Sequence, residues 1–301
     1  MHIPTLLPIL TVLIPTLAAP TPPQVFLSAQ SKFTSLPNFF IQSLSTTDPA
    51  LLPPAPPRLG LLDEWTWESV RARVGAIARE RGRKVKIVVL QRHGQGTHNA
   101  AESKYGTPAW NDYYSKLPLY FDAPLTPLGV HQLSVTRSTL RRELSLGLSV
   151  SRVYSSPLSR CLNTTQLVWA DTGVVPRVVE ELRETYGVHT CDARRSRTEL
   201  AALYPAFEFS GLVGEEDPWW TPDKRETEEE TRARVLKALE QIFDEEEDGN
   251  AVEDGVVSIV CHGGVIESVL DVTGHRAFNV PPSGLIPLVI VDSRARKGEM
   301  L

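Results

Sequence analysis

The sequence has few cysteines and no surplus of basic residues. Its 301 residues include three cysteines, 31 lysines and arginines, and 36 aspartates and glutamates, for a formal net charge of -5. Without a basic stripe to neutralise a phosphate backbone, the chain is not expected to bind nucleic acid. The cysteines are odd in number and lack the spacing of a disulfide framework, so they are expected to be unpaired apolar side chains. They are Cys161, Cys191 and Cys261.

Long uninterrupted apolar runs are also missing. Residues 1–19, MHIPTLLPILTVLIPTLAA, are too short for a comfortable membrane span, are interrupted by three prolines and contain no lysine or arginine. Their apolar character and the small residues Ala18 and Ala19 predict a signal peptide, and therefore a protein of the secretory pathway or a secreted one. The alternative is an uncleaved leader on a cytoplasmic protein. No stable membrane span is expected.

Composition indicates one large domain preceded by an arm. With 42% hydrophobic and 22% charged residues, the chain can bury a full core. Residues 20–62 are rich in proline and serine and predict an extended arm. The domain proper is expected over residues 63–293, starting with a helix that Asp63 caps, and residues 294–301 form a frayed tail. The sequence leaves the oligomeric state open.

Within the domain, segments typical of strands alternate with segments typical of helices. Thr126 is expected to cap a long helix; further helices are expected at 158–170 and 226–247, and strands at 150–154 and 287–292. This alternation predicts an α/β fold with a mainly parallel central sheet flanked by helices on both faces. Insertions are expected near 100–124 and 188–224, above the pocket, where they would select the substrate.

Two β-rich apolar runs each end in a histidine. KVKIVVLQRHG places Arg92 and His93 at the end of one run, and VVSIVCHGG places His262 at the end of the other. RVYSSPLSRC, between them, predicts a strand, a turn and a helix start that brings Arg160 to the same sheet edge. Guanidinium groups match phosphate oxygens in pairs, so two arginines and two histidines at one edge favour a phosphate site.

These motifs resemble the histidine phosphatase superfamily, whose members are also called phosphoglycerate-mutase-like. The resemblance covers about 84–292 and rests on Arg-His-Gly with Asn99 in the next loop, LTPLGVHQ, SSPLSRC, LRE and Cys-His-Gly-Gly. More narrowly, RETYGVHTCDARRS at 183–196 is similar to the fungal phosphoglycerate-mutase-like branch. Arg-His-Gly alone is a weak signal, whereas several motifs in the right order are specific.

The resemblance implies a role for each motif residue. His93 would attack phosphorus and carry the phosphoryl group covalently. Glu184 would protonate the leaving oxygen and later activate water, while its neighbours Glu180 and Glu181 are expected to be solvated. Only two residues separate Glu184 from Gly187, where the family usually has three, so His189 and Asp192 stay open as the acid. The phosphoryl oxygens are expected to bind Arg92, Arg160, Asn99 and His262.

No metal or other cofactor is expected. His98, His93 and His262 lack a carboxylate at ligand spacing, and the adjacent arginines would repel a divalent cation. His98 is expected in the pocket wall, and Gln95 and Gly96 in the loop beside it.

The expected function is hydrolysis of a small phosphorylated substrate, the predicted partner of the site, through a phosphohistidine intermediate. Two alternatives remain. One is a phosphoglycerate mutase, in which Arg194, Arg195 and Arg197 would clamp a second anionic group. The other is a phosphate-binding protein without catalysis, which the full set of two histidines and two arginines disfavours.

Overall fold

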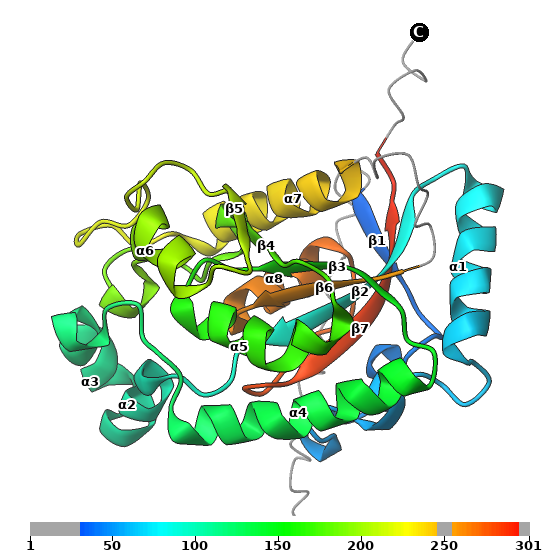
Figure 1. The fold of residues 1–301 in the computed structure, drawn as a ribbon, viewed down its shortest axis with the longest axis horizontal. Helices are drawn as coiled ribbons and strands as arrows, with labels where there is room; N and C mark the ends of the chain where they lie inside the picture. The colour runs from blue at the N-terminus through cyan, green and yellow to red at the C-terminus, as the bar shows by residue number, and fades with distance from the viewer. Residues whose placement is uncertain (1–30, 246–254, 295–301) are drawn as a thin grey trace, which may run out of the picture. The chain divides into compact units, whose positions relative to one another are not determined.

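Apolar, largely β-branched strands form the centre of a seven-stranded sheet. In the computed structural model, which describes residues 31–245 and 255–294, the strand order is β1-β7-β2-β6-β3-β4-β5 (Figure 1). The strands are β1 (Phe33–Leu36), β2 (Val85–Arg92), β3 (Val150–Ser155), β4 (Arg177–Val179), β5 (Glu208–Gly211), β6 (Val256–Cys261) and β7 (Leu285–Asp292). Only β7 pairs in antiparallel fashion, with β1 and β2, whereas β2, β6, β3, β4 and β5 are parallel neighbours. The predicted mainly parallel α/β sheet is confirmed.

Helices cover both faces of this sheet. Val88 and Leu90 of β2 pack on one face with α7 (Glu228–Asp244) and α8 (Gly263–Val272). Ile87 and Val89 of the same strand pack on the opposite face with other helices. Successive strand residues point to opposite faces, so a strand buried on both sides must be apolar throughout. The helices of this second face are α1 (Trp67–Arg81), α4 (Pro127–Ser145) and α5 (Ser159–Trp169).

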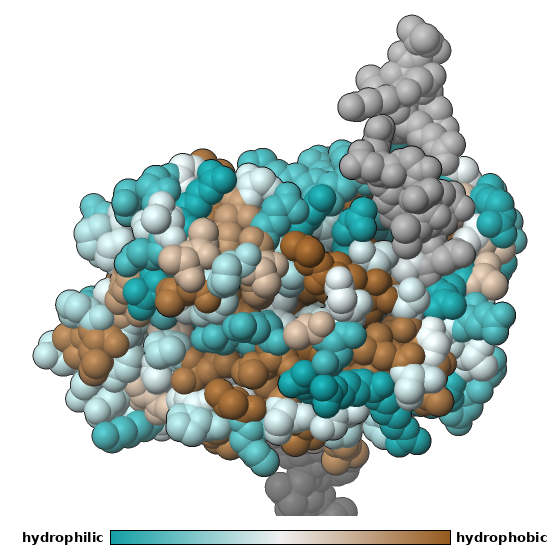
Figure 2. Space-filling model, viewed as in Figure 1, coloured by the Kyte–Doolittle hydropathy of each residue, from teal (hydrophilic) through white to brown (hydrophobic). Residues whose placement is uncertain are grey.

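The outer surface of α4 is not wholly polar. Its exposed residues include Leu128, Val130 and Val135. Figure 2 shows apolar areas over α4 and α5 that polar residues interrupt. Apolar residues dispersed in this way are ordinary on a folded protein.

Capping side chains set the helix boundaries. Thr126 accepts a hydrogen bond from the Gly129 amide, so the predicted start of α4 is confirmed. The start of α1 is corrected from Asp63 to Thr66, whose hydroxyl accepts from the Ser69 amide. Asp63 instead pairs with Arg58 at 2.9 Å. A threonine followed three residues later by serine offers the reciprocal bonds of a capping box, which outcompetes an isolated aspartate.

Residues 31–62 differ from the extended arm expected over 20–62. Strand β1 pairs with β7 at the edge of the sheet, and Phe33 and Leu59 are fully buried. The proline-rich composition conceals this strand, because four residues give too short a pattern to detect and β7, far along the chain, supplies its pairing partner. The predicted signal peptide over 1–19 lies outside the described residues. The secreted location therefore stays a prediction.

The two insertions pack against each other. The first contains most of α2 (Thr97–Tyr105), α3 (Thr107–Asp112) and two short 3-10 turns, and the second contains α6 (Arg197–Leu203) and strand β5. The Thr190 hydroxyl donates to the Leu117 carbonyl at 2.7 Å, and the Asp122 amide donates to the Thr190 carbonyl at 3.2 Å. Across the described ranges, no helix is both long and apolar enough to cross a membrane.

Candidate active site

Sheet register places the two motif histidines side by side. Arg92 of β2 pairs with Cys261 of the parallel strand β6, so His93 and His262 leave the sheet together at its carboxyl edge. Their ring centroids are 5.0 Å apart. The ring centroid of His98 lies 5.5 Å from that of His93. The sheet register therefore brings the two motif histidines together at one edge of the sheet.

A backbone carbonyl fixes the His93 tautomer. Nδ1 of His93 is 2.7 Å from the Gly94 carbonyl oxygen, which can only accept, so Nδ1 carries the proton and donates it. Burial, followed by the nearby Arg160 guanidinium, lowers the pKa of His93 well below its ordinary value. The ring is therefore neutral, and its Nε2 lone pair is available as a nucleophile.

Two arginines present unpaired donors beside His93. Arg160 is fully buried and uses its terminal nitrogens on the Cys191 carbonyl at 2.6 Å and on Asp192 at 2.9 Å. Arg92 donates to the Val280 carbonyl at 2.9 Å. Within the described part of the chain, the buried Nε atoms of both arginines have no hydrogen-bond partner. An unmade bond of this kind costs about 1–3 kcal/mol, so both donors favour an anionic ligand at this site.

The Glu184 carboxyl group lies next to the N-terminal end of α8. One carboxyl oxygen accepts from the Thr185 amide at 3.0 Å, and the other is 3.5 Å from the Gly264 amide. A Cβ on Gly264 would lie 2.7 Å from a Glu184 carboxyl oxygen, so a side chain at this position would displace the carboxyl group. Burial, followed by the Asp192 carboxylate, raises the pKa of Glu184. A carboxyl group that stays protonated to higher pH is suited to donate a proton.

The short spacing after Glu184 is absorbed by a tight turn. Gly187 has a φ of +87°, and a Cβ there would lie 1.8 Å from the Lys224 carbonyl oxygen. Arg234 donates to the Arg183 carbonyl at 2.8 Å, next to Glu184. Glycine at this position therefore allows the chain to turn closely against the Lys224 backbone.

The other two candidates for the acid are held in less suitable states. Both carboxylate oxygens of Asp192 accept from guanidinium groups, from Arg160 at 2.9 Å and from Arg225 at 3.1 Å. Burial, followed by Arg225, lowers the pKa of His189 to about 4, so this imidazole carries no extra proton near neutral pH. These environments favour Glu184 as the acid.

Asn99 and Gln95 have mainly structural contacts. The Asn99 side-chain oxygen accepts from the Gly96 amide at 2.9 Å and caps α2. This bond orients the Asn99 amide and leaves its NH₂ group for a ligand, so its phosphate contact stays a prediction. The Gln95 side chain accepts from the Thr126 hydroxyl at 2.8 Å and joins the loop after β2 to the start of α4.

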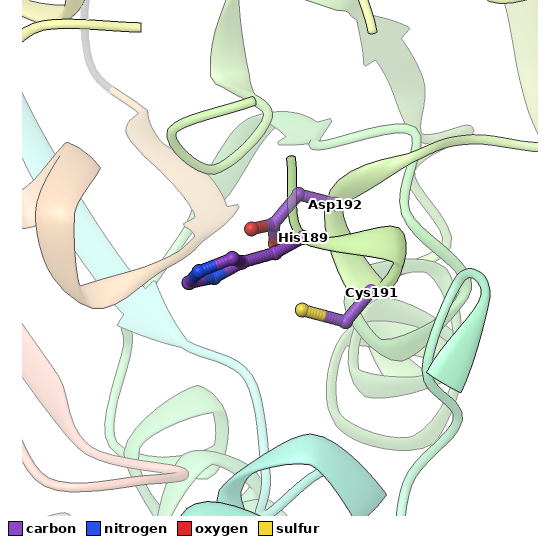
Figure 3. Close-up of side chains that lie close together, drawn as sticks. All are labelled: His189, Cys191 and Asp192. Carbon is purple, nitrogen blue, oxygen red and sulfur yellow. The ribbon is translucent and has the colours of Figure 1, made fainter. Parts of the chain in front are cut away.

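His189, Cys191 and Asp192 form one cluster with the side-chain types of a metal site. Their ligand atoms lie within 4.8 Å of one another, and the residues come from a single short segment (Figure 3). Two arginines already bind Asp192, and they would repel a cation. Burial, followed by Asp192, raises the pKa of the Cys191 thiol well above its ordinary value, whereas metal binding requires a thiolate. The cluster does not fit a divalent cation.

A buried ionic network corrects two sequence-based expectations. Glu180 and Glu181, expected to be solvated, are 0% and 3% exposed. Glu180 pairs with Arg183 at 3.1 Å and with Arg194 at 3.0 Å. Pairing with these guanidinium groups compensates for the loss of hydration that the buried Glu180 carboxylate would otherwise suffer.

The arginine clamp considered for the mutase alternative is not assembled. Arg194 donates to Glu180 and to several backbone carbonyls, among them those of Val213 and Glu216, so it is not free for a substrate. Arg195 pairs with Asp122 at 3.1 Å, and Arg197 is exposed. The structure therefore does not support a second anion site from these three residues.

The sequence did not identify two polar residues, Asp122 and Ser156, that contact the segments carrying Arg160 and His262. Asp122, which is buried, accepts from the Ser159 amide at 2.8 Å at the start of α5, one residue before Arg160. The Ser156 hydroxyl oxygen is 2.8 Å from Nε2 of His262. The position of Ser156 inside SSPLSRC was an available signal, whereas no local pattern marks Asp122.

Comparison with known proteins identifies the family. The model of the histidine phosphatase superfamily (branch 1) matches residues 88–285, which span β2 to the start of β7 and include every site residue discussed above. The chain belongs to the histidine phosphatase superfamily.

Fungal proteins are among the relatives of this histidine phosphatase. It is 33% identical over 286 residues to "Probable phosphoglycerate mutase" of Arthroderma benhamiae, covering 86% of this chain and 84% of that one. It is also 33% identical over 263 residues to "Probable phosphoglycerate mutase PMU1" of Saccharomyces cerevisiae, covering 78% and 87%. The predicted fungal phosphoglycerate-mutase-like relationship is confirmed.

Solved structures of similar fold include phosphatases. Mycobacterial glucosyl-3-phosphoglycerate phosphatase matches with a TM-score of 0.42 and 22% identity over 68% of this chain and 90% of that one. The ecdysone phosphate phosphatase of Bombix mori matches with a TM-score of 0.44 and 17% identity over 67% and 88%.

Proposed function

We propose that this histidine phosphatase is a phosphomonoesterase that hydrolyses a small phosphorylated substrate through a phosphohistidine intermediate. The observation that carries the proposal is the free Nε2 of neutral His93 beside the unpaired buried Nε atoms of Arg92 and Arg160. Together they provide a nucleophile and an anion site in one pocket. A protein that only bound phosphate would need the arginines but not an oriented imidazole lone pair.

The first chemical step transfers the phosphoryl group to the enzyme. Nε2 of His93 attacks phosphorus, and the bond from phosphorus to the ester oxygen breaks. Glu184, in its protonated form, gives its proton to the departing oxygen, so that an alcohol leaves rather than an alkoxide. The raised pKa of Glu184 keeps this acid form populated.

The second step regenerates the free enzyme. Glu184, now a carboxylate, takes a proton from water as the water oxygen attacks phosphorus. The bond between Nε2 and phosphorus breaks, inorganic phosphate leaves, and His93 is neutral again. Arg92, Arg160 and His262 stabilise the charge of the phosphoryl oxygens in both steps, and a fixed donor of this kind contributes about two to three orders of magnitude in rate.

Phosphoglycerate mutase activity is the second candidate, because relatives at 33% identity carry that name. A mutase must retain a bisphosphorylated intermediate, and Arg194, which the sequence offered for a second anionic group, is bound within the protein. With 3-phosphoglycerate as the substrate, we expect release of inorganic phosphate to be much faster than formation of 2-phosphoglycerate. Parallel assays of the two products measure this, with other phosphomonoesters beside them to find the preferred substrate. Stoichiometric 2-phosphoglycerate without free phosphate would establish the mutase instead.

Activity should not depend on a metal ion. Arginine side chains neutralise the phosphoryl group at this site, and two of them occupy the carboxylate of the nearest metal-like cluster. We expect full phosphatase activity after dialysis against excess chelator, measured with p-nitrophenyl phosphate. Loss of activity that returns only when a divalent ion is added back would contradict this prediction.

A further inference from the structure

Ser156 contacts the imidazole ring of His262, the second histidine of the site. Its hydroxyl oxygen is 2.8 Å from Nε2 of His262, and both residues are fully buried. The Cys161 sulfur is 3.4 Å from the same nitrogen and 3.9 Å from Nδ1. Because the Ser156 hydroxyl already contacts Nε2, we infer that Nδ1 is the ring nitrogen available to a phosphoryl oxygen.

The position of the single ring proton decides what His262 does. Burial, followed by the Arg160 guanidinium, lowers the pKa of His262 well below its ordinary value, so the ring is neutral. A neutral imidazole donates from one nitrogen and accepts at the other. With the proton on Nδ1, His262 attracts a phosphoryl oxygen, whereas with the proton on Nε2 it presents a lone pair and repels one.

One arrangement of protons gives each nearby donor an acceptor. The Leu158 amide donates to the Ser156 oxygen at 3.4 Å, and the Cys161 thiol donates to the Cys261 carbonyl at 3.4 Å. The Ser156 hydroxyl proton can then go to Nε2 of His262, which leaves the ring proton on Nδ1. In the reverse arrangement, the Ser156 proton would turn to the Cys161 sulfur, which is a weak acceptor.

We propose that Ser156 is a positioning residue that sets the tautomer of His262, so that His262 donates a hydrogen bond from Nδ1 to the transferring phosphoryl group. The proposal rests on the proposed phosphatase function, and it adds a role for the second serine of SSPLSRC beyond shaping the turn before Arg160. Ser156 acts through His262 and does not itself contact the substrate.

Activity measurements give the first test. A fixed donor to a transition state contributes about two to three orders of magnitude, and Ser156→Ala keeps the imidazole while freeing its tautomer. We therefore expect Ser156→Ala to lower kcat for p-nitrophenyl phosphate by about 10- to 100-fold, with a smaller change in KM. Ser156→Thr, which retains a hydroxyl, should recover most of this loss.

Ser155 provides a matched control. It is the adjacent residue and is equally buried, but its hydroxyl donates to the Ser156 carbonyl at 3.0 Å and accepts from Thr165. Ser155→Ala thus removes a buried hydroxyl from the same turn without removing the contact to His262. We expect it to keep a kcat close to wild type. Equal losses in Ser155→Ala and Ser156→Ala would refute the proposal, because they would show only a damaged turn.

Nitrogen NMR of the His262 ring tests the tautomer without any turnover. In the wild-type enzyme with inorganic phosphate, we expect a protonated Nδ1 and an unprotonated Nε2, and in Ser156→Ala a smaller protonated fraction at Nδ1. A wild-type ring protonated at Nε2 would overturn the proposal, even if the variant fails to fold. This result stands apart from the function of the protein, since failure to hydrolyse any phosphomonoester would reject the phosphatase but leave the tautomer measurable.

Discussion

We expect His93→Ala to abolish both turnover and covalent labelling. The same atom, Nε2 of His93, attacks phosphorus and then carries the phosphoryl group, so no partial reaction survives its removal. The pocket itself should persist, because Arg92 and Arg160 are held by the Val280 carbonyl and by Asp192 rather than by His93. The measurement is release of inorganic phosphate together with acid-labile labelling from a phosphorus-32 substrate, with phosphate binding as a check on the pocket.

His98 is the appropriate comparison for this variant. Its ring lies 5.5 Å from that of His93, and burial, followed by Arg160, lowers its pKa well below the ordinary value, so it is also neutral. However, His98 has no carbonyl partner on Nδ1, which is buried and unpaired within the described structure. His98→Ala should therefore still form the phosphoenzyme. A His93→Ala enzyme that is labelled, beside an unlabelled His98→Ala enzyme, would move the nucleophile to His98.

The core of the site was predictable because it depends on local pattern and parallel topology. Runs of β-branched apolar residues predict strands β2 and β6, and a histidine follows each run. Parallel strands deliver their carboxyl ends to one edge, so His93 and His262 meet without any knowledge of the loops. Arg160 follows by the same logic from the next strand and the helix after it.

The polar surroundings of these residues were not predictable. Glu180 looks like a solvated residue in a charged stretch, and only the fold brings Arg194 against it. Asp192 lies near Glu184 in sequence and resembles a second acid, yet Arg160 and Arg225 occupy both of its oxygens. Such pairings join segments that the chain order separates, and a short pattern carries no information about them.

The predicted start of the domain at residue 63 was too late for a similar reason. Strand β1 has four residues, and its partner β7 lies at the far end of the sequence. Residues 20–62 are rich in proline and serine, which predicts an extended arm. However, a strand that pairs with the edge of a sheet can be short and can have a low intrinsic β-propensity. Strand β5 and helix α6 escaped detection in the same way inside the second insertion.

We expect Glu184→Gln to slow hydrolysis of alkyl phosphates by about two to four orders of magnitude, the usual contribution of a general acid. An alkoxide is a poor leaving group and depends on the proton from Glu184. The wild-type rate should also fall as the pH rises through the raised pKa of Glu184, because deprotonation removes the acid form. Glutamine does not titrate, so this descending limb should be missing from the pH profile of the variant. Glu181→Gln is the matched control, since that carboxylate pairs with Lys237 at 2.7 Å.

With p-nitrophenyl phosphate, Glu184→Gln should separate the two chemical steps. Nitrophenolate leaves with little help, so phosphoryl transfer to His93 survives better than it does with alkyl phosphates. Water attack on the phosphohistidine still lacks its base, because the amide of glutamine cannot accept the proton. We expect an initial burst of nitrophenol followed by slow turnover, with phosphoenzyme accumulating to nearly one equivalent, measured by rapid mixing and acid quench. Equal losses on both substrates without a burst would instead assign the acid to Asp192 or His189, the other two candidates from the sequence.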